Sequence, residues 1–372
     1  MHVLILPSWY PTEKDPTNGV FFAEQAEALA EYGHRVSVIA LYGDAPGGLY
    51  VEKMTRGKAR EYALHFTLMP FHLTFFRIMA AIMKLFKGEF SGDRPDLIHV
   101  HSLRATRYAR ALKALYGIPY VVTEHVSWFE RGLLSENDRR AAASGYAHAS
   151  AMIAVSDGLR DQIAPLSRLP VQVVPNMVDK RFYHKDLKEH PGECFRFLSI
   201  GSLNRNKGMD AVIDAFYEAK KNRDDITLTI CGDGEERRAL ELQVSNLGLC
   251  ENVRFTGQVS RDQCAEYLSE CDAFVLASRV ETFGIVLAEA LACGRPVVMT
   301  KTGAWRQIIS ERTGLAVDVD DISALSRAMV AVSENTGQYD PEEIRAFCRE
   351  RFSASTVCGR LTNIYEEVLG SP

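Results

Sequence analysis

The chain has 372 residues, of which 47% are hydrophobic and 9% aromatic, enough apolar material for about two globular domains. Its 48 acidic side chains outnumber its 43 basic ones and give a formal net charge of −5. These values exclude a disordered chain and argue against a protein organised around nucleic-acid phosphates.

Short β-branched runs alternate with helical stretches along the whole chain. Helices are expected from about Phe21 and from about Ala105 in the first half. Strands that are apolar throughout and separated by helices are typical of parallel sheets covered on both faces. The expected strands are 2–8, 35–42, 96–102, 119–125, 151–156 and 171–176, then 195–201, 226–232, 252–257, 273–278, 296–300 and 314–319.

Two such series predict an α/β protein with two Rossmann-like, doubly wound domains. We expect a first domain over residues 1–182 and a second over 183–352. A C-terminal helix over 353–372 is expected to cross back to the first domain.

The eight cysteines all lie in the second half, and none forms a C-x-x-C pair. Several fall inside apolar runs, which favours buried, reduced thiols in a cytoplasmic protein. The apolar run at the start is short, has no basic leader and ends in a proline, so we interpret it as a core strand rather than a signal peptide.

Ligands of open α/β sheets bind beyond the carboxyl ends of the strands. After the strand at 195–200, Gly201 permits a tight exit, and Arg205 and Lys207 stand near a helix start. Two cations beside a helix N-terminus suit an anion such as a diphosphate. A solvated basic loop is the alternative interpretation.

A second junction carries the sequence ETFGIVLAEA, residues 281–290. Glu281 is expected in a loop and Glu289 inside the helix that follows Gly284. The amides after Phe283 and Gly284 are available for hydroxyls or phosphate oxygens. A sugar nucleotide fits this arrangement, although a helix acid plus one exposed glutamate would also explain it.

The segment SRVETFGIVLAEALACGRPVV resembles the E-x7-E signature of the retaining family 4 glycosyltransferases. The resemblance extends over nearly the whole chain in ordered matches. The matching segments are PTNGVFFAEQAEALAEYGHRVSVI, PDLIHVHS, PYVVTEH, VVPNMVD, GSLNRNKGMD, CGDGEERRALE, VRFTGQV and TKTGAWRQII.

The resemblance implies the GT-B fold, with a nucleotide-sugar donor on the second domain and an acceptor on the first. It implies that Glu289 binds the ribose and that Glu281 holds the transferred sugar. Lys207 would neutralise the diphosphate leaving group. The amides of Phe283, Gly284, Ile285 and Val286 would also contact the donor.

The chain departs from the family pattern at two points. The family arginine after the first glycine of the loop is replaced here by Ser202, and Arg205 is the expected substitute. Ala304 and Gln307 occupy places where the family commonly has a glycine and a glutamate.

In the first domain, His125 resembles a family histidine that faces the transferred sugar. Asn18 and Gly19 match a loop near the diphosphate and acceptor. His99 and His101 share one strand face, but no third metal ligand is evident, and structural roles are expected. A D-x-D pair, Asp318 and Asp320, falls where GT-B enzymes have a loop, so we expect neither a metal nor another cofactor.

Residues 71–90 form the most apolar helical stretch, with three cations along one side. It is predicted either as a core helix with a narrow solvated edge or as a peripheral contact with an anionic membrane. The second case favours a lipid-linked acceptor in bacterial envelope or capsule synthesis, at the inner face of the plasma membrane.

Two further functions remain open from the residues. An NAD-dependent oxidoreductase would need a G-x-G-x-x-G after an early strand, and LILPSWYP has no glycine there. A non-catalytic sugar-nucleotide binder would share the fold, but it would not require His125, Lys207, Glu281 and Glu289 together. The expected function is therefore a retaining, metal-independent transfer from a UDP- or GDP-sugar to a glycan or lipid-linked acceptor.

Overall fold

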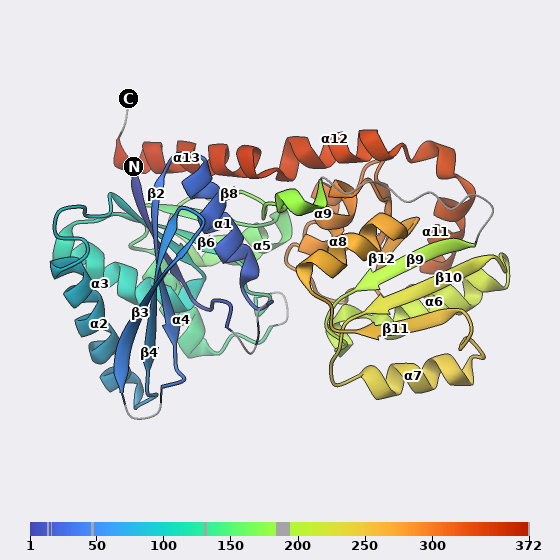
Figure 1. Ribbon diagram of the computed structural model, residues 1–372, viewed down its shortest axis with the longest axis horizontal. Helices are drawn as coiled ribbons and strands as arrows, with labels where there is room; N and C mark the ends of the chain where they lie inside the picture. Colours follow the sequence, from blue (N-terminus) through green and yellow to red (C-terminus); the bar gives the residue numbers. More distant parts are fainter. Residues whose placement is uncertain (13–14, 16, 46–47, 130–131, 184–193, 371–372) are drawn as a thin grey trace. The chain divides into compact units, whose positions relative to one another are not determined.

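The computed structural model describes residues 1–12, 15, 17–45, 48–129, 132–183 and 194–370. The chain forms two compact units, and each has its own sheet and core (Figure 1). Unit 1 contains residues 1–174 and 357–372, and unit 2 contains residues 175–356. Residues 175–182 and 353–356 thus belong to unit 2, which differs from the domain limits expected at 182 and 352.

Unit 1 has an eight-stranded sheet in the order β3-β4-β2-β1-β5-β6-β7-β8. All neighbouring strands are parallel except the antiparallel pair β3 and β4. The strands are β1 (His2–Pro7), β2 (Arg35–Tyr42), β3 (Leu49–Arg56), β4 (Ala59–Phe66), β5 (Leu97–His101), β6 (Tyr120–Glu124), β7 (Ala151–Ala154) and β8 (Val171–Val173).

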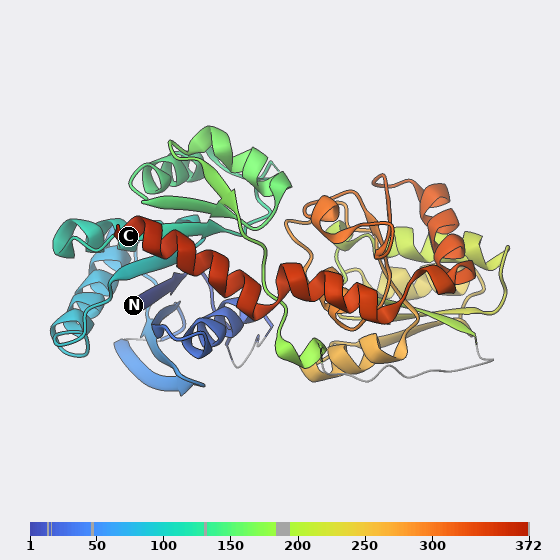
Figure 2. The ribbon, with the colours of Figure 1, turned by 90° about the horizontal axis from the view of Figure 1, so that it is seen from above.

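The helices of unit 1 follow the strands in the alternating manner that the sequence predicted. They are α1 (Val20–Glu31), α2 (Phe71–Lys87), η1 (Leu103–Ala105), α3 (Thr106–Tyr116), α4 (Glu136–Tyr146), α5 (Asp157–Ile163), η2 (Ala164–Leu166) and most of α13 (Ala354–Leu369). Helix α13 lies over this unit (Figure 2), where the hydroxyl of Tyr365 is 2.6 Å from Nδ1 of His99. Nε2 of His34 is 2.7 Å from the hydroxyl of Thr362.

Unit 2 has a six-stranded parallel sheet in the order β11-β10-β9-β12-β13-β14. Helices α6, α7 and α11 pack in one group and α8, α9 and α12 in another, with the sheet between them (Figure 1). The elements are η3 (Lys180–Phe182), β9 (Phe195–Ile200), η4 (Arg205–Lys207), α6 (Met209–Lys220), β10 (Ile226–Cys231), α7 (Arg237–Asn246), β11 (Val253–Gly257), α8 (Arg261–Glu270), β12 (Ala273–Leu276), α9 (Ile285–Ala292), β13 (Val297–Thr300), α10 (Trp305–Ile308), β14 (Gly314–Val317), α11 (Ile322–Glu334), η5 (Thr336–Gln338) and α12 (Pro341–Phe352).

Each sheet reverses its strand order at one place. In unit 1 the chain leaves β1 toward β2 and later returns to add β5 on the other side of β1. In unit 2 the corresponding neighbours are β9 and β12. Open α/β sheets bind ligands at such a reversal, beyond the carboxyl ends of the strands.

Candidate active site

The loop after β9 and the loop after β12 are locked together at the strand reversal of unit 2. Gly208 has φ of 63°, and a Cβ at this position would stand 2.0 Å from the carbonyl oxygen of Ala277. Only glycine combines this left-handed backbone with such a close approach. The two loops therefore keep a fixed distance.

Arg279 makes a second connection between the same loops. Its guanidinium donates to both carboxylate oxygens of Asp210, at 2.9 and 2.8 Å, and to the carbonyl oxygen of Arg205 at 2.8 Å. The forked pairing lowers the pKa of Asp210, against the opposing effect of burial. Sequence reasoning missed Arg279, which orients the backbone of the η4 turn that carries Lys207.

Lys207 and Glu281 meet across this junction. Nζ of Lys207 donates to Oε2 of Glu281 at 2.5 Å, and the two side chains are 28% and 12% exposed. The structure thus brings together two of the expected site residues from different loops. Both still reach solvent, so a ligand at the strand reversal can contact them.

Helix α9 begins directly after Gly284, which caps it with φ of 78°. Glu281 lies in the preceding loop. The first amides of the helix, at Ile285 and Val286, have no intrahelical acceptor, because that acceptor would lie before the helix. The ring of Phe283 is buried in an edge-to-face contact with Phe352 at 5.6 Å, so Phe283 offers a ligand its backbone rather than its side chain.

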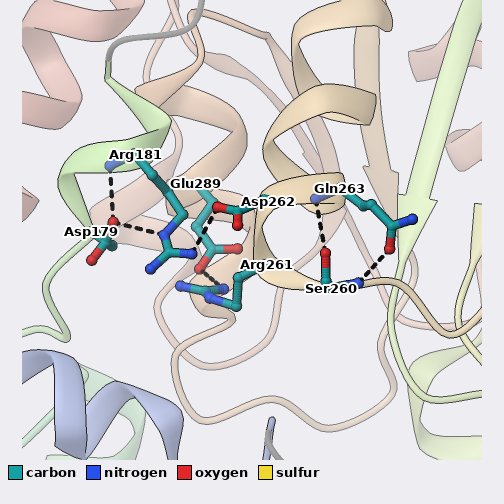
Figure 3. A network of polar contacts seen from close by, with 7 residues as sticks. All are labelled: Asp179, Arg181, Ser260, Arg261, Asp262, Gln263 and Glu289. Atoms are coloured by element: carbon teal, nitrogen blue, oxygen red, sulfur yellow. Dashed lines mark hydrogen bonds and ion pairs between the residues drawn. The ribbon is translucent and has the colours of Figure 1, made fainter.

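Glu289 lies inside α9, and its side chain is 2% exposed. Its Oε1 accepts a hydrogen bond from Nη1 of Arg261 at 2.5 Å (Figure 3). The Arg261 guanidinium also lies 4.9 Å from the ring centroid of Phe182. Sequence reasoning missed Arg261, whose position at the start of a helix gave no sign of its pairing with Glu289.

The remaining expected donor residues lie in the same loop. Ser202 and Arg205 are exposed, and no described residue pairs with the Arg205 side chain. The backbone of Gly232 packs against Gly201, because a Cβ on Gly232 would stand 1.9 Å from the Gly201 carbonyl oxygen. These residues lie at the strand reversal, and in the described structure none of them forms a hydrogen bond with Glu281.

The two aspartates of the D-x-D pair are both engaged in ion pairs. Asp318 pairs with Lys301 at 2.9 Å, and Asp320 pairs with Arg279 at 2.8 Å. Within the described residues, no three His, Cys, Asp or Glu side chains are grouped so that they could hold a metal ion.

His125 follows β6 in unit 1 and is 7% exposed. Its Nε2 lies 3.0 Å from Nδ1 of His101, and its ring packs against Phe21 and Phe22. Burial lowers the pKa of His125 to about 3, so the ring is neutral near pH 7. Its Nδ1 has no hydrogen-bond partner among the described residues.

His99 differs from His125, because both of its ring nitrogens are paired. Nε2 lies 2.7 Å from the Thr123 hydroxyl, and Nδ1 is bonded to Tyr365 as described above. Burial lowers the pKa of His99 to about 3. His99 is therefore a structural core residue.

Glu124 was not expected as a site residue. The carboxylate is fully buried and accepts from the backbone amides of Leu103, His125 and Val126 and from the hydroxyl of Tyr146. Burial raises the pKa of Glu124, while these donors oppose the rise. The loops after β5 and β6 are thereby held together around one side chain.

The loop before α1 brings Asn18 and Gly19 to the same end of the unit 1 sheet. Gly19 has φ of 76°, and a Cβ there would stand 2.8 Å from the Trp9 ring. A pocket of about 360 Å³ opens beside this loop. It is lined by Ser8, Trp9, Asn18, Ser102, Leu103, Arg104, His125, Val126, Ser127 and Trp128.

Residues 19–182 match the family described as Glycosyltransferase Family 4, and residues 180–349 match Glycosyl transferases group 1. A phosphatidyl-myo-inositol mannosyltransferase of Mycobacterium leprae is 30% identical over 286 residues, 74% of each chain. The N-acetyl-alpha-D-glucosaminyl L-malate synthase of Bacillus anthracis is 26% identical, covering 95% of this chain and 94% of the relative.

Among solved structures, Anabaena HepE in complex with UDP and glucose superposes with a TM-score of 0.76 at 19% identity. The match covers 99% of this chain and 100% of HepE. Both the sequence matches and the fold agree with the expectation drawn from the E-x7-E segment. The chain is a member of the group 1, family 4 glycosyltransferases and has the GT-B fold.

Proposed function

We propose that this glycosyltransferase takes its sugar from a UDP- or GDP-sugar, works without a metal ion and retains the anomeric configuration. The observation that carries the proposal is the contact between Lys207 and Glu281 at the strand reversal of unit 2. A cation and a carboxylate are held there beside the start of α9, at the strand reversal where this class of sheet binds ligands.

Lys207 is the group we assign to the leaving diphosphate. A preorganised cation stabilises the negative charge that develops as the bond between the anomeric carbon and the phosphate oxygen breaks. The α9 amides of Ile285 and Val286 add partial positive charge at the helix start. Arg205 is exposed nearby and supplies a second cation.

Glu281 has two tasks in this proposal. Its carboxylate holds Lys207 in place and accepts hydrogen bonds from hydroxyls of the transferred sugar. Glu289 is assigned to the ribose, and because its carboxylate is nearly buried, the ribose must reach it beside Arg261 or by displacing that side chain. The role expected for His125, a contact with the transferred sugar, remains a prediction.

The transfer step needs no base from the protein, because the departing phosphate takes up the proton of the acceptor hydroxyl. The electron pair of the breaking bond goes to the diphosphate, and the acceptor oxygen forms the new bond from the same face of the sugar. The acceptor proton passes to the departing phosphate oxygen. The two aspartates of the D-x-D pair, Asp318 and Asp320, are paired with Lys301 and Arg279. We therefore assign them no metal ion and assign the charge stabilisation to cations of the protein.

The acceptor is proposed to be a glycan or a lipid-linked molecule of bacterial envelope or capsule synthesis, used at the inner face of the plasma membrane. Helix α2 supports a peripheral contact, because Phe76 is 66% and Leu73 41% exposed, next to Leu68 at 70%. The opposite face of α2 is buried in the core. No helix in the described part of the chain has the length and apolar character to cross a bilayer.

The test is donor binding followed by donor hydrolysis. We expect UDP or GDP, but not NAD, to raise the melting temperature of the protein. UDP is the first choice, because HepE was solved with UDP and glucose. Stabilisation by NAD alone would contradict the proposal.

Hydrolysis of the preferred sugar nucleotide is then compared between Lys207→Met and Lys221→Met. The second variant is the control, because Lys221 also pairs with a glutamate, Glu218, at 2.7 Å on the surface of unit 2. We expect Lys207→Met to lose roughly 10²–10³-fold in kcat and the control to keep its rate. Equal rates in both variants would remove Lys207 from the site, and nucleotide binding without hydrolysis or transfer would favour a non-catalytic binder.

A further inference from the structure

The pocket of about 360 Å³ in unit 1 lies at the strand reversal between β1 and β5. Its lining comes from the loops that follow β1, β5 and β6. Both the place and the size are those of a small-molecule site in an open α/β sheet. Since the donor is assigned to unit 2, the ligand of this pocket is a separate question.

The formal charge of the described pocket lining is positive and comes from an arginine. Among the residues that the structure describes, no aspartate, glutamate or lysine lines the pocket, and Arg104 is the one arginine. Burial keeps His125 uncharged near pH 7. The charge preference of the pocket therefore depends on Arg104.

Arg104 is held in a defined orientation by an aromatic neighbour. Its guanidinium carbon lies 4.4 Å from the ring centroid of Trp128. This cation–π contact holds the guanidinium over the indole ring, and the N–H groups of Arg104 can still donate to a ligand. Among the described residues, no carboxylate pairs with Arg104.

Hydrogen-bonding groups for a hydroxyl stand beside this cation. Asn18 and Ser127 contribute polar side chains to the lining. His125 also lines the pocket, but its Nδ1 is buried, so it is not among the groups that a ligand reaches. A ligand with a hydroxyl next to an acidic group would match both features.

We propose that this pocket binds an acceptor, or the end of an acceptor, in which a hydroxyl lies beside a carboxylate or phosphate that Arg104 recognises. Arg104 is then a specificity-determining residue, and Trp128 positions it. The inference rests on the proposed function, because it identifies the pocket as the acceptor side of the transferase. Either acidic group satisfies the guanidinium fork.

Three probes that share a three-carbon skeleton test the proposal: glycerol, D-glycerate and glycerol 3-phosphate. Binding to the full chain is measured by calorimetry at constant ionic strength and without a donor nucleotide. We expect at least one acidic probe to bind, with glycerol weaker by tenfold or more, because a hydrogen bond to a charged group is worth roughly tenfold to a hundredfold in affinity. The comparison of D-glycerate with glycerol 3-phosphate separates the carboxylate from the phosphate.

The variant Arg104→Gln should bind the acidic probe about tenfold or more weakly than the wild type. In this variant the affinities for the acidic probe and for glycerol should be similar. Arg139→Gln is the matched control, since Arg139 is exposed on α4 and does not line the pocket. Trp128→Leu keeps the charge but removes the stacking, and we expect an intermediate loss. Because Arg104 is exposed, its variant should melt at the wild-type temperature.

Three results would overturn the proposal: no probe binds at millimolar concentration, glycerol binds as tightly as the acidic probes, or Arg104→Gln behaves as Arg139→Gln. Nucleotide stabilisation is scored on the same samples. Stabilisation by UDP or GDP without binding of an acidic probe would reject this inference alone. Binding of an acidic probe without any nucleotide effect would instead contradict the proposed function.

Discussion

The ion pair between Arg261 and Glu289 leads to a quantitative prediction about unit 2. Replacing Arg261 by methionine keeps a long side chain over Phe182 and removes the charge. Glu289 is 2% exposed, so its carboxylate would lose the guanidinium and gain little water in return. The variant should therefore be destabilised well beyond the effect of a surface substitution.

The magnitude follows from the exposure of the two partners. Removal of one member of a buried ion pair costs about 3–5 kcal/mol. Arg261 is 18% exposed, so water can enter on its side, and the low end of that range applies. A loss of about 3 kcal/mol corresponds to roughly 6–12 °C in the melting temperature of a unit of this size.

The assay is differential scanning calorimetry of Arg261→Met, Glu289→Gln and the double variant. The double variant removes both charges, so we expect it to recover at least half of the loss. Arg237→Met is the control, since Arg237 pairs with Glu241 where the side chains are 31% and 47% exposed, and such pairs are worth less than about 1 kcal/mol.

A loss below about 1 kcal/mol in Arg261→Met, comparable with that of Arg237→Met, would refute the reasoning. So would a double variant that is as unstable as the sum of the single ones. Either result would mean that the Glu289 carboxylate is solvated in solution and open to a ribose without any movement of Arg261.

Three other predictions concern the backbone, pH and the surface. Gly208→Ala should reduce donor hydrolysis by more than about tenfold while the protein stays folded by circular dichroism, because its Cβ would stand 2.0 Å from the Ala277 carbonyl oxygen; wild-type hydrolysis would contradict this. The pKa of His99 and of His125 is lowered to about 3, so the unfolded chain binds more protons than the folded chain between pH 6.5 and 3. The free energy of unfolding should therefore decrease, as the pH is lowered, by about 1.4 kcal/mol per pH unit for each histidine. Calorimetry in this window should show a shallower slope for His99→Gln, and an equal slope would contradict the assignment. Phe76→Ser should lower sedimentation with anionic vesicles several-fold without changing the melting temperature, because Phe76 is 66% exposed; unchanged sedimentation would remove α2 from the membrane proposal.

The sequence predicted the parallel strands because most of them are short β-branched runs, and six of these strands, β1, β5, β6, β7, β12 and β13, are buried at every residue. The hairpin of β3 and β4 was missed, since its residues do not form such a run. β3 is largely exposed and carries polar side chains such as Glu52 and Lys53, as expected for an antiparallel strand at the edge of a sheet.

The chain order predicted where the expected donor residues lie relative to the strands, but it did not predict the arginines that pair with or orient them. Lys207, Glu281 and Glu289 occupy recognisable positions in a motif, whereas Arg261 and Arg279 reach them from a helix start and a loop. No periodicity relates residues on different strand ends, because the relation exists only once the sheet has formed. The partners of a motif residue are thus a property of the tertiary structure.

Glu124 shows the same principle for a residue that sequence patterns assign to the surface. An acid at the end of a strand is ordinarily solvated, yet here it is fully buried. Three backbone amides from the loops after β5 and β6 donate to it, which explains how a carboxylate without a cation partner is tolerated. These loops carry Arg104, His125 and Trp128. Because one side chain ties them together, the geometry of the pocket depends on Glu124 as much as on the residues that line it.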